Sequence, residues 1–349
     1  MGPEVAIVGG GMFGTATALE LTEAGADVTI YEAKDQILAG ASGANQWRLH
    51  RGYHYPLSDA TAEFCRRSEP KFRDRFKEAV VSDQSHYYAI DEESWVTSGE
   101  YMEFCERHGL EYKQVNLDLV DSTRIESVLR VEENRVNKDV LRDILRVSLD
   151  EMGVTVECNS RIRSTDELRG YDNIVVATYA HSNELLADYD SLRRRYRFEV
   201  CEIPEIRLPD NYTGNNIIVV YGPFMSVDHW GDSDTFVMGD YTHMVHGSNV
   251  GYKPEVPEAY KDLVNKGLVR DPEISNFENF RRHGKQYIPG VANCEYVGSM
   301  FTIRTKLPDV EDTDARPSIV QREGDVISVF GGKLATSVSS AEKITELII

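Results

Sequence analysis

Residues 5–32 read VAIVGGGMFGTATALELTEAGADVTIYE, and this stretch decides the fold. Residues 5–8 form a short apolar run typical of a buried parallel strand, and a glycine-rich turn follows directly. Apolar residues then recur at helical spacing up to Gly25, and a second strand-like run ends at Glu32. The pattern predicts a βαβ unit of the type that binds dinucleotides.

Three glycines in the turn have the spacing that a bound pyrophosphate requires. Gly9 allows the tight turn, Gly11 lets the backbone approach the phosphates, and Gly14 lets the helix pack on the strand. Glu32 follows 18 residues after Gly14, where an acid would accept hydrogen bonds from the adenosine ribose. Its charge would repel a 2′-phosphate, which disfavours an NADP-type ligand.

The regular alternation of strands and helices stops after Glu32. A polar, glycine-rich loop at residues 34–56 is followed by an α+β segment, an amphipathic helix at 138–152 and a buried strand at 174–178. Runs of alternating apolar and polar residues at 200–244 predict antiparallel strands. Residues 258–268 are predicted to form a helix. We therefore expect an α/β protein whose Rossmann-like, FAD-binding domain is interrupted by an inserted α+β substrate domain with a mostly antiparallel sheet. We expect the FAD-binding domain to comprise residues 1–80, 135–190 and 296–349. The substrate domain would comprise residues 81–134 and 191–295.

The interrupted domain favours FAD over NAD as the dinucleotide. An NAD-dependent dehydrogenase normally continues its alternating strands and helices through the first half of the chain. Such a dehydrogenase remains the alternative to an FAD-dependent enzyme. The isoalloxazine of FAD lies far from the adenine and is covered by segments remote in sequence. Gly331 and Gly332 open a C-terminal helix whose amide groups suit the pyrimidine side of that ring.

Four patches of sequence resemble the FAD-dependent oxidoreductases of the D-amino-acid oxidase and glycerol-3-phosphate dehydrogenase superfamily. They are residues 5–32, 40–56, 174–182, and 303–304 with 331–336. The second patch is most similar to members like L-2-hydroxyglutarate oxidase. In the third patch Tyr179 stands where the family usually has glycine.

The dinucleotide motif and the resemblance together imply a set of FAD contacts spread over these patches. They are Gly9, Gly11, Met12, Phe13, Gly14, Glu32, Ala33, Ser42, Asn45, Gln46, Arg48, Leu49, Ala177, Thr178, Gly331, Gly332, Lys333, Leu334, Ala335 and Thr336. Lys333 would face the N1–C2=O region of the flavin and stabilise negative charge there, or would lie in solvent at the helix start.

Oxidation by a flavin needs a group that holds the charged end of the substrate and a polar group near the ring. The resemblance places Arg304 at the substrate, where a guanidinium would hold a carboxylate. His50 is a candidate for a general base, a hydrogen-bond donor to the ring or a covalent flavin tether, with a structural role as the alternative. Tyr53 and Tyr55 could face the substrate or pack in the core. Of Arg48 and Arg51, one would line the site and the other meet FAD phosphate or solvent.

The remaining polar groups carry no clear signal for a metal. Asp228, His229, Asp240, His243 and His246 match no ligand spacing, so we expect no metal.

The formal net charge of -20 excludes nucleic acid as a partner and disfavours membrane surfaces. The five scattered cysteines, and a start without a signal peptide, predict a reducing, cytoplasmic location.

These features together predict a flavoenzyme. We expect oxidation of a CH–NH or CH–OH bond in a small anionic substrate (an amino acid, N-substituted amino acid or 2-hydroxy acid) by hydride transfer to flavin N5. The electrons would pass to O2 or to a carrier. A non-catalytic FAD-binding protein is the alternative from another class.

Overall fold

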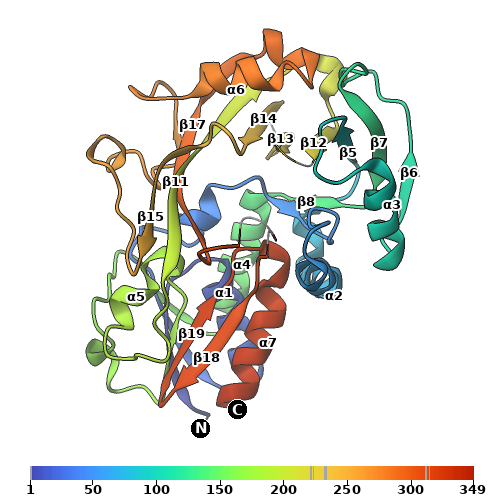
Figure 1. Ribbon diagram of the computed structural model, residues 1–349. Helices are drawn as coiled ribbons and strands as arrows, with labels where there is room; N and C mark the ends of the chain where they lie inside the picture. The colour runs from blue at the N-terminus through green and yellow to red at the C-terminus, as the bar shows by residue number, and fades with distance from the viewer. Residues whose placement is uncertain (1, 221, 223, 232–233, 311–312, 314) are drawn as a thin grey trace.

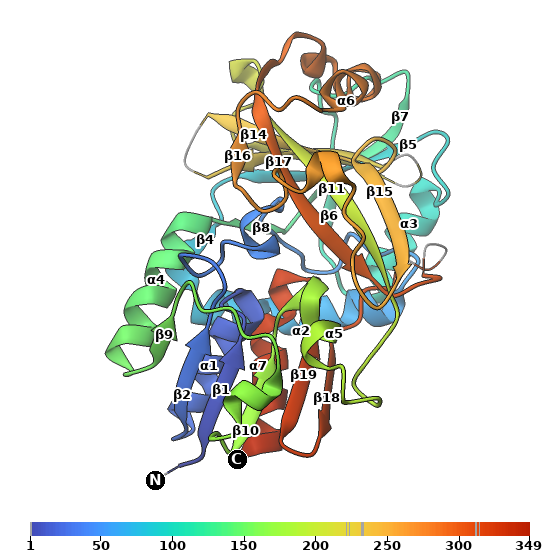
Figure 2. The ribbon, with the colours of Figure 1, turned by 90° about the vertical axis from the view of Figure 1, so that its left-hand side faces the viewer.

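The computed structural model describes residues 2–220, 222, 224–231, 234–310, 313 and 315–349. The βαβ unit expected at residues 5–32 lies at the centre of a six-stranded sheet (Figures 1 and 2). Its strands run in the order β18-β19-β10-β1-β2-β9, all parallel except β18. They are β1 (Glu4–Val8), β2 (Asp27–Tyr31), β9 (Thr155–Glu157), β10 (Asn173–Val176), β18 (Ile319–Glu323) and β19 (Val326–Phe330).

Strand β1 is buried on both faces of this sheet, which explains its unbroken apolar run. Val5 and Ile7 pack into a core shared with three helices, whereas Ala6 and Val8 face a second core that contains Leu185. The helices on the first face are α1 (Met12–Glu23), α4 (Lys138–Glu151) and α7 (Ser337–Ile348). A short helix, α5 (Ser182–Leu185), covers the second face.

The second sheet has ten strands and is mostly antiparallel, as expected, with only the pair β5 and β12 parallel. Strand β11 is at its centre and pairs with β17 along nearly its whole length, as well as with β14 and β15. The strands are β5 (Ser85–Asp91), β6 (Tyr112–Gln114), β7 (Ile125–Val131), β11 (Tyr196–Arg207), β12 (Asn215–Val220), β13 (Met225–Trp230), β14 (Thr235–Asp240), β15 (Val245–Gly251), β16 (Leu268–Val269) and β17 (Glu295–Lys306).

Helices and a small sheet complete the structure around this second layer. Helix α6 (Phe277–Gly284) covers the outer face of the ten-stranded sheet, and α3 (Ser98–Arg107) packs near β5 and β7 (Figure 1). The small sheet lies between the two large ones and joins β3 (Arg48–Leu49), β8 (Asn134–Val136) and β4 (Val80–Val81), with α2 (Asp59–Arg75) beside it. Among the helices described, none combines the length and the apolar character needed to cross a membrane.

The structure differs from the sequence-based expectation at two places. Residues 295–306, where we expected the FAD-binding domain to resume, form β17 of the ten-stranded sheet, and the six-stranded sheet resumes at β18. The helix expected at 258–268 is only a single turn, η6 (Glu258–Tyr260). Val264, four residues after this turn, instead forms a bridge with Phe301 of β17, because this segment runs along the edge of the sheet.

Candidate functional site

A cavity of about 590 Å³ lies between the two large sheets. On one side it reaches the carboxyl ends of the parallel strands, at Val8, Tyr31 and Ala177. On the other side it reaches the inner face of the ten-stranded sheet, at Cys201 and Gly239. In open α/β sheets the carboxyl edge is the place where ligands bind.

The glycine-rich turn after β1 has the geometry of a dinucleotide cradle. Gly9 has a φ of +110°, and a Cβ atom there would lie 2.6 Å from the carbonyl oxygen of Ala177. A Cβ atom at Gly14 would lie 1.9 Å from the carbonyl oxygen of Gly9, so α1 begins tightly against the turn. The turn therefore leaves room for a pyrophosphate at the positive end of α1.

Glu32 is held at the cavity wall by backbone amides. Its two carboxylate oxygens accept hydrogen bonds from Gly10 N–H at 2.7 Å and from Lys34 N–H at 2.8 Å. These bonds fix the carboxylate while leaving lone pairs that suit the ribose hydroxyls of an adenosine.

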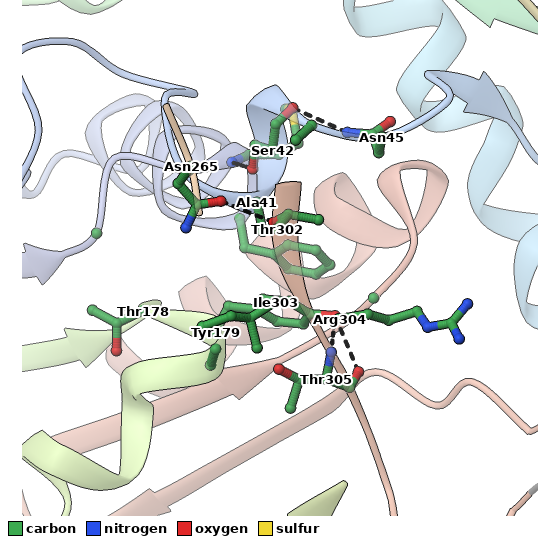
Figure 3. A pocket seen from close by; sticks show the side chains of 18 of the residues that line it. Ala41, Ser42, Asn45, Thr178, Tyr179, Asn265, Thr302, Ile303, Arg304 and Thr305 are labelled. Atoms are coloured by element: carbon green, nitrogen blue, oxygen red, sulfur yellow. Dashed lines mark hydrogen bonds between the residues drawn. The ribbon is translucent and has the colours of Figure 1, made fainter. Parts of the chain in front are cut away.

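The loop that carries Ser42 closes over the start of α1. The amide of Met12 donates to Ser42 Oγ at 3.1 Å, and Asn45 Nδ2 donates to the carbonyl of Ser42 at 3.0 Å (Figure 3). Because Ser42 Oγ accepts from the helix, its own proton is available to a phosphate oxygen. Trp47, at the end of this loop, has a φ of +53° and is buried.

The turn after β19 closes the other end of the cofactor region. A Cβ atom at Gly331 would lie 2.3 Å from the ring of Phe13, so only glycine fits beside α1. Lys333 Nζ lies 4.9 Å from the centre of the Tyr55 ring. The glycine turn and the ammonium of Lys333 thus face the cavity together. A backbone turn and a cation are the groups that suit the pyrimidine side of a flavin.

Most of the FAD contacts expected from the sequence line this cavity. They are Gly9, Gly11, Met12, Phe13, Glu32, Ala33, Ser42, Asn45, Gln46, Arg48, Ala177, Thr178, Gly331, Gly332, Lys333 and Leu334. Gly14, Leu49, Ala335 and Thr336 are not on its wall. Leu49, Ala335 and Thr336 are buried in the surrounding structure, and Gly14 packs on Gly9.

Tyr179 adopts a conformation that normally belongs to glycine. Its φ is +53°, and its ring stacks on Phe330 with an interplanar angle of 10°. The Tyr179 hydroxyl donates to the carbonyl oxygen of Thr305 at 3.0 Å and accepts from its amide at 2.9 Å (Figure 3). The backbone path usual for glycine is therefore kept, and the side chain joins the two sheets.

Arg304 lies on β17 and lines the cavity. Its Nε donates to Glu199 Oε2 at 2.7 Å, and its Nη1 lies 3.3 Å from the sulfur of Met244. The Tyr241 ring covers the guanidinium at 4.7 Å, and Lys306 Nζ shares Glu199 at 2.9 Å. Burial raises the pKa of Glu199, but Arg304 and Lys306 outweigh this and hold it below its ordinary value.

Of the other predicted catalytic residues, the structure brings only His50 to the cavity. Tyr53 and Tyr55 are fully buried in the core under α3, and Tyr53 Oη donates to the carbonyl of Glu111 at 2.5 Å. His54, between the two tyrosines, lines the cavity instead. Its ring lies 4.8 Å from that of His50, and burial holds the pKa of His54 well below its ordinary value.

Arg48 lines the cavity but is already bound by two buried carboxylates. Its Nε donates to Asp228 at 3.0 Å and its Nη1 donates to Glu133 at 3.0 Å, and all three side chains are at most 2% exposed. Arg51 points outward and pairs with Glu132. Arg48 therefore acts within the protein's own charge network and is not a free cation for a ligand.

Several cavity residues carried no local sequence signal. They are Phe224, Tyr241, Met244, Asn265, Thr302 and Arg316. They come from separate strands and loops, and only the pairing of β11 with β14 and β17 brings most of them together. His54 had a weaker signal, because it lies within the patch at residues 40–56, whereas Glu133, behind the cavity wall, lies outside every patch.

Three of the polar residues considered for metal binding take part in protein contacts. Asp228 binds Arg48, His246 Nε2 pairs with Glu202 at 2.8 Å, and Asp240 pairs with His283 Nδ1 at 2.8 Å. His243 lies near the last pair, and its ring centre is 5.5 Å from that of His283. The ion pair joins β14 to α6, which accounts for this cluster, and the expectation of no metal stays a prediction.

Comparison with known proteins gives one family match across the chain. The model of the DAO family, described as FAD dependent oxidoreductase, matches residues 4–347. The FAD-dependent monooxygenase FPY4 of Fusarium mangiferae is 25% identical over 98% of this chain and 90% of its own. The FAD-dependent monooxygenase kojA of Aspergillus flavus is 26% identical over 99% of this chain and 85% of its own.

Solved structures with the same fold include enzymes named for amino acids. Glycine oxidase from Geobacillus kaustophilus has a TM-score of 0.71 at 16% identity, over 99% of this chain and 93% of its own. L-amino acid deaminase from Proteus vulgaris has a TM-score of 0.73 at 12% identity, over the same shares. At these identities the likeness concerns the fold.

Proposed function

Because the chain belongs to the DAO family of FAD-dependent oxidoreductases, we propose that it oxidises the carbon next to the amino or hydroxyl group of a small carboxylate. The substrate class is a 2-amino acid, an N-substituted amino acid or a 2-hydroxy acid. One observation carries this proposal: Arg304 lies on the wall of the same cavity as the cofactor turns. When bound, FAD supplies an acceptor for two electrons, with its N5 taking the hydride.

Arg304 is oriented so that part of its guanidinium remains for a ligand. Glu199 engages Nε, while the Nη groups face Met244 and the ring of Tyr241. A carboxylate from the substrate would add two charge-assisted hydrogen bonds at those groups. Binding at this point would hold the substrate's reacting carbon within the cavity.

Lys333 has a complementary role at the opposite end of the ring site. Its ammonium lies beside Tyr55 and lines the cavity with Gly331 and Gly332. A cation there would stabilise the negative charge that the cofactor gains on reduction. O2 or a carrier protein would then take the electrons.

The test is an anaerobic screen on the purified holoenzyme. The protein should be yellow, and amino acids, N-methyl amino acids or 2-hydroxy acids should bleach its absorbance near 450 nm. Glycerol phosphates, which lack a carboxylate, provide the comparison. A colourless protein that cannot be reconstituted with FAD, or a flavin that no member of these classes reduces, contradicts the proposal.

A further inference from the structure

His50 lies on the cavity wall with one ring nitrogen turned into the protein. Its Nδ1 is buried, lies 3.5 Å from Glu133 Oε1 and has no partner in hydrogen-bond geometry within the described part of the chain, and the side chain is 13% exposed. Among the described residues, no hydrogen-bond partner of Nε2 is found. The inner nitrogen of the ring thus faces a carboxylate, which leaves Nε2 for the cavity.

The contacts of Glu133 stabilise its ionised form. Its Oε2 accepts from Arg48 Nη1 and from Tyr88 Oη, each at 3.0 Å, and its Oε1 accepts from the amide of Arg51 at 3.1 Å. Burial alone would raise the pKa of Glu133, but the contacts with His50 and Arg48 hold it far below its ordinary value. The negative charge of Glu133 would repel a lone pair on Nδ1 and attract a proton there, so it favours the form of His50 that carries its proton on Nδ1.

The surroundings of His50 also keep its ring neutral. Burial, and next the positive charge of Lys333, lower the pKa of His50, whereas Glu133 raises it. The charged and titratable groups around the ring are Arg48 on β3, His54 on the following loop, His86 on β5, Glu133 before β8 and Lys333 before η8 (Leu334–Thr336). A neutral ring with its proton on Nδ1 has a lone pair on Nε2, which makes it a proton acceptor facing the cavity.

A proton acceptor at this place distinguishes two kinds of substrate. A neutral amine needs no base during oxidation, because its nitrogen lone pair forms the C=N bond as the hydride leaves. An amine with a pKa of about 10 keeps a small neutral fraction near neutral pH, and this fraction can bind and react without a base on the protein. An alcohol must lose its hydroxyl proton during the reaction, and a hydroxyl holds that proton about as tightly as water does, at a pKa of about 15.7. A positioned base is therefore expected in an alcohol oxidase.

We propose that His50, positioned by Glu133, accepts the hydroxyl proton of a 2-hydroxy acid, and that the substrate is an alcohol and not an amine. This rests on the proposed function. The C–H bond breaks with its electron pair passing to FAD, the O–H bond breaks with its proton passing to His50 Nε2, and a C=O bond forms. The product is a 2-oxo acid, and FAD gains two electrons. Glu133 is a positioning residue, since it acts through His50.

The first experiment compares substrates that differ only in the reacting group. Holoenzyme is mixed anaerobically with both enantiomers of lactate and alanine, malate and aspartate, and phenyllactate and phenylalanine. Bleaching of the flavin by a hydroxy acid, and not by its amino partner, supports the proposal. Bleaching by amino acids alone overturns it but leaves the proposed function standing. Bleaching by neither class, and by no N-methyl amino acid, contradicts the proposed function.

The second experiment tests the two residues on the best substrate of that screen. His50→Asn should retain FAD and reduce the rate of bleaching about 10²- to 10⁴-fold, the usual contribution of a general base. Glu133→Gln should slow the reaction and move the acid limb of its pH profile to lower pH. Glu132→Gln is the matched control, because this neighbouring side chain is 61% exposed. A His50→Asn enzyme with the wild-type rate overturns the proposal.

The third measurement does not depend on activity. In protein labelled with ¹⁵N-histidine, long-range ¹⁵N–¹H NMR spectra identify which nitrogen carries the proton, and His50→Asn assigns the signal. We expect the Nδ1–H form in the wild type and its loss in Glu133→Gln. An Nε2–H form in the wild type overturns the proposal, and this result decides the question should Glu133→Gln fail to fold.

Discussion

The Tyr179 hydroxyl bonds both the amide and the carbonyl of Thr305, so one side chain satisfies two backbone groups of β17. Tyr179 follows β10 of the six-stranded sheet, whereas Thr305 is in the ten-stranded sheet and adjoins Arg304. The contact links the cofactor region directly to the residue proposed to hold the substrate. Its energetic contribution should therefore be visible in both stability and substrate binding.

Tyr179→Phe keeps the stacked ring but removes both hydrogen bonds. We expect the free energy of unfolding to fall by about 1–3 kcal/mol, since two buried backbone groups lose their partner. The KM should rise as well, because Arg304 is next to Thr305. Urea unfolding and initial rates measure the two effects. Tyr112→Phe is the control, since that hydroxyl contacts only Glu106 at the surface; equal behaviour of the two variants would refute the role assigned to Tyr179.

Arg304→Ala should weaken substrate binding while FAD remains bound. Loss of charge-assisted hydrogen bonds that each contribute about 1.5–3 kcal/mol raises KM at least about 10-fold. Steady-state kinetics measure KM, and the ratio of absorbance at 450 and 280 nm measures bound flavin. Arg207→Ala is a suitable control, because Arg207 pairs with Glu295 at the surface. Loss of flavin from Arg304→Ala would move this residue from the substrate to the cofactor.

The acid limb of the pH profile should report on His50. A base must be neutral, so activity falls as the pH drops through the pKa of His50, which burial and Lys333 lower. Lys333→Met removes a positive charge and should raise that pKa, which moves the limb to higher pH. Glu133→Gln should move it in the opposite direction. Shifts of both variants in one direction would show that another group controls the limb.

Gly14→Ala should prevent FAD binding. The added methyl group would meet the carbonyl oxygen of Gly9 at 1.9 Å, so the turn or the start of α1 must move. Flavin content after purification and the Kd for added FAD, measured by fluorescence quenching, test this. Gly170→Ala provides the comparison, because a Cβ there meets no atom within 4 Å. A Gly14→Ala protein that purifies with a full complement of flavin would show that the turn tolerates the methyl group.

Local signals account for what the sequence could predict. The strand, turn and helix at residues 5–32 lie together in the chain, as do the loop at 40–56 and the turn at 331–333, so motifs located much of the cofactor side of the cavity wall. Tyr241 and Glu199 are different, because their positions depend on strand pairing between remote segments. The sequence of residues 295–306 did not assign them to either sheet, and only their pairing with β11 places them in the second. Tyr53 and Tyr55 point to one side of their segment and His54 to the other, and the sequence does not show which side meets the cavity. In the structure the two tyrosines are buried in the core and His54 lines the cavity.

The two walls of the cavity come from different sheets, and this separates two tasks that an engineer would want to change one at a time. The glycine turns are anchored in the six-stranded sheet and His50 follows β3 of the small sheet, whereas Arg304, Tyr241 and Met244 are carried by the ten-stranded layer. Side chains on the second wall can be exchanged without altering the glycine contacts on the first. Libraries restricted to that wall should consequently yield variants that accept new substrates and still fold around their flavin.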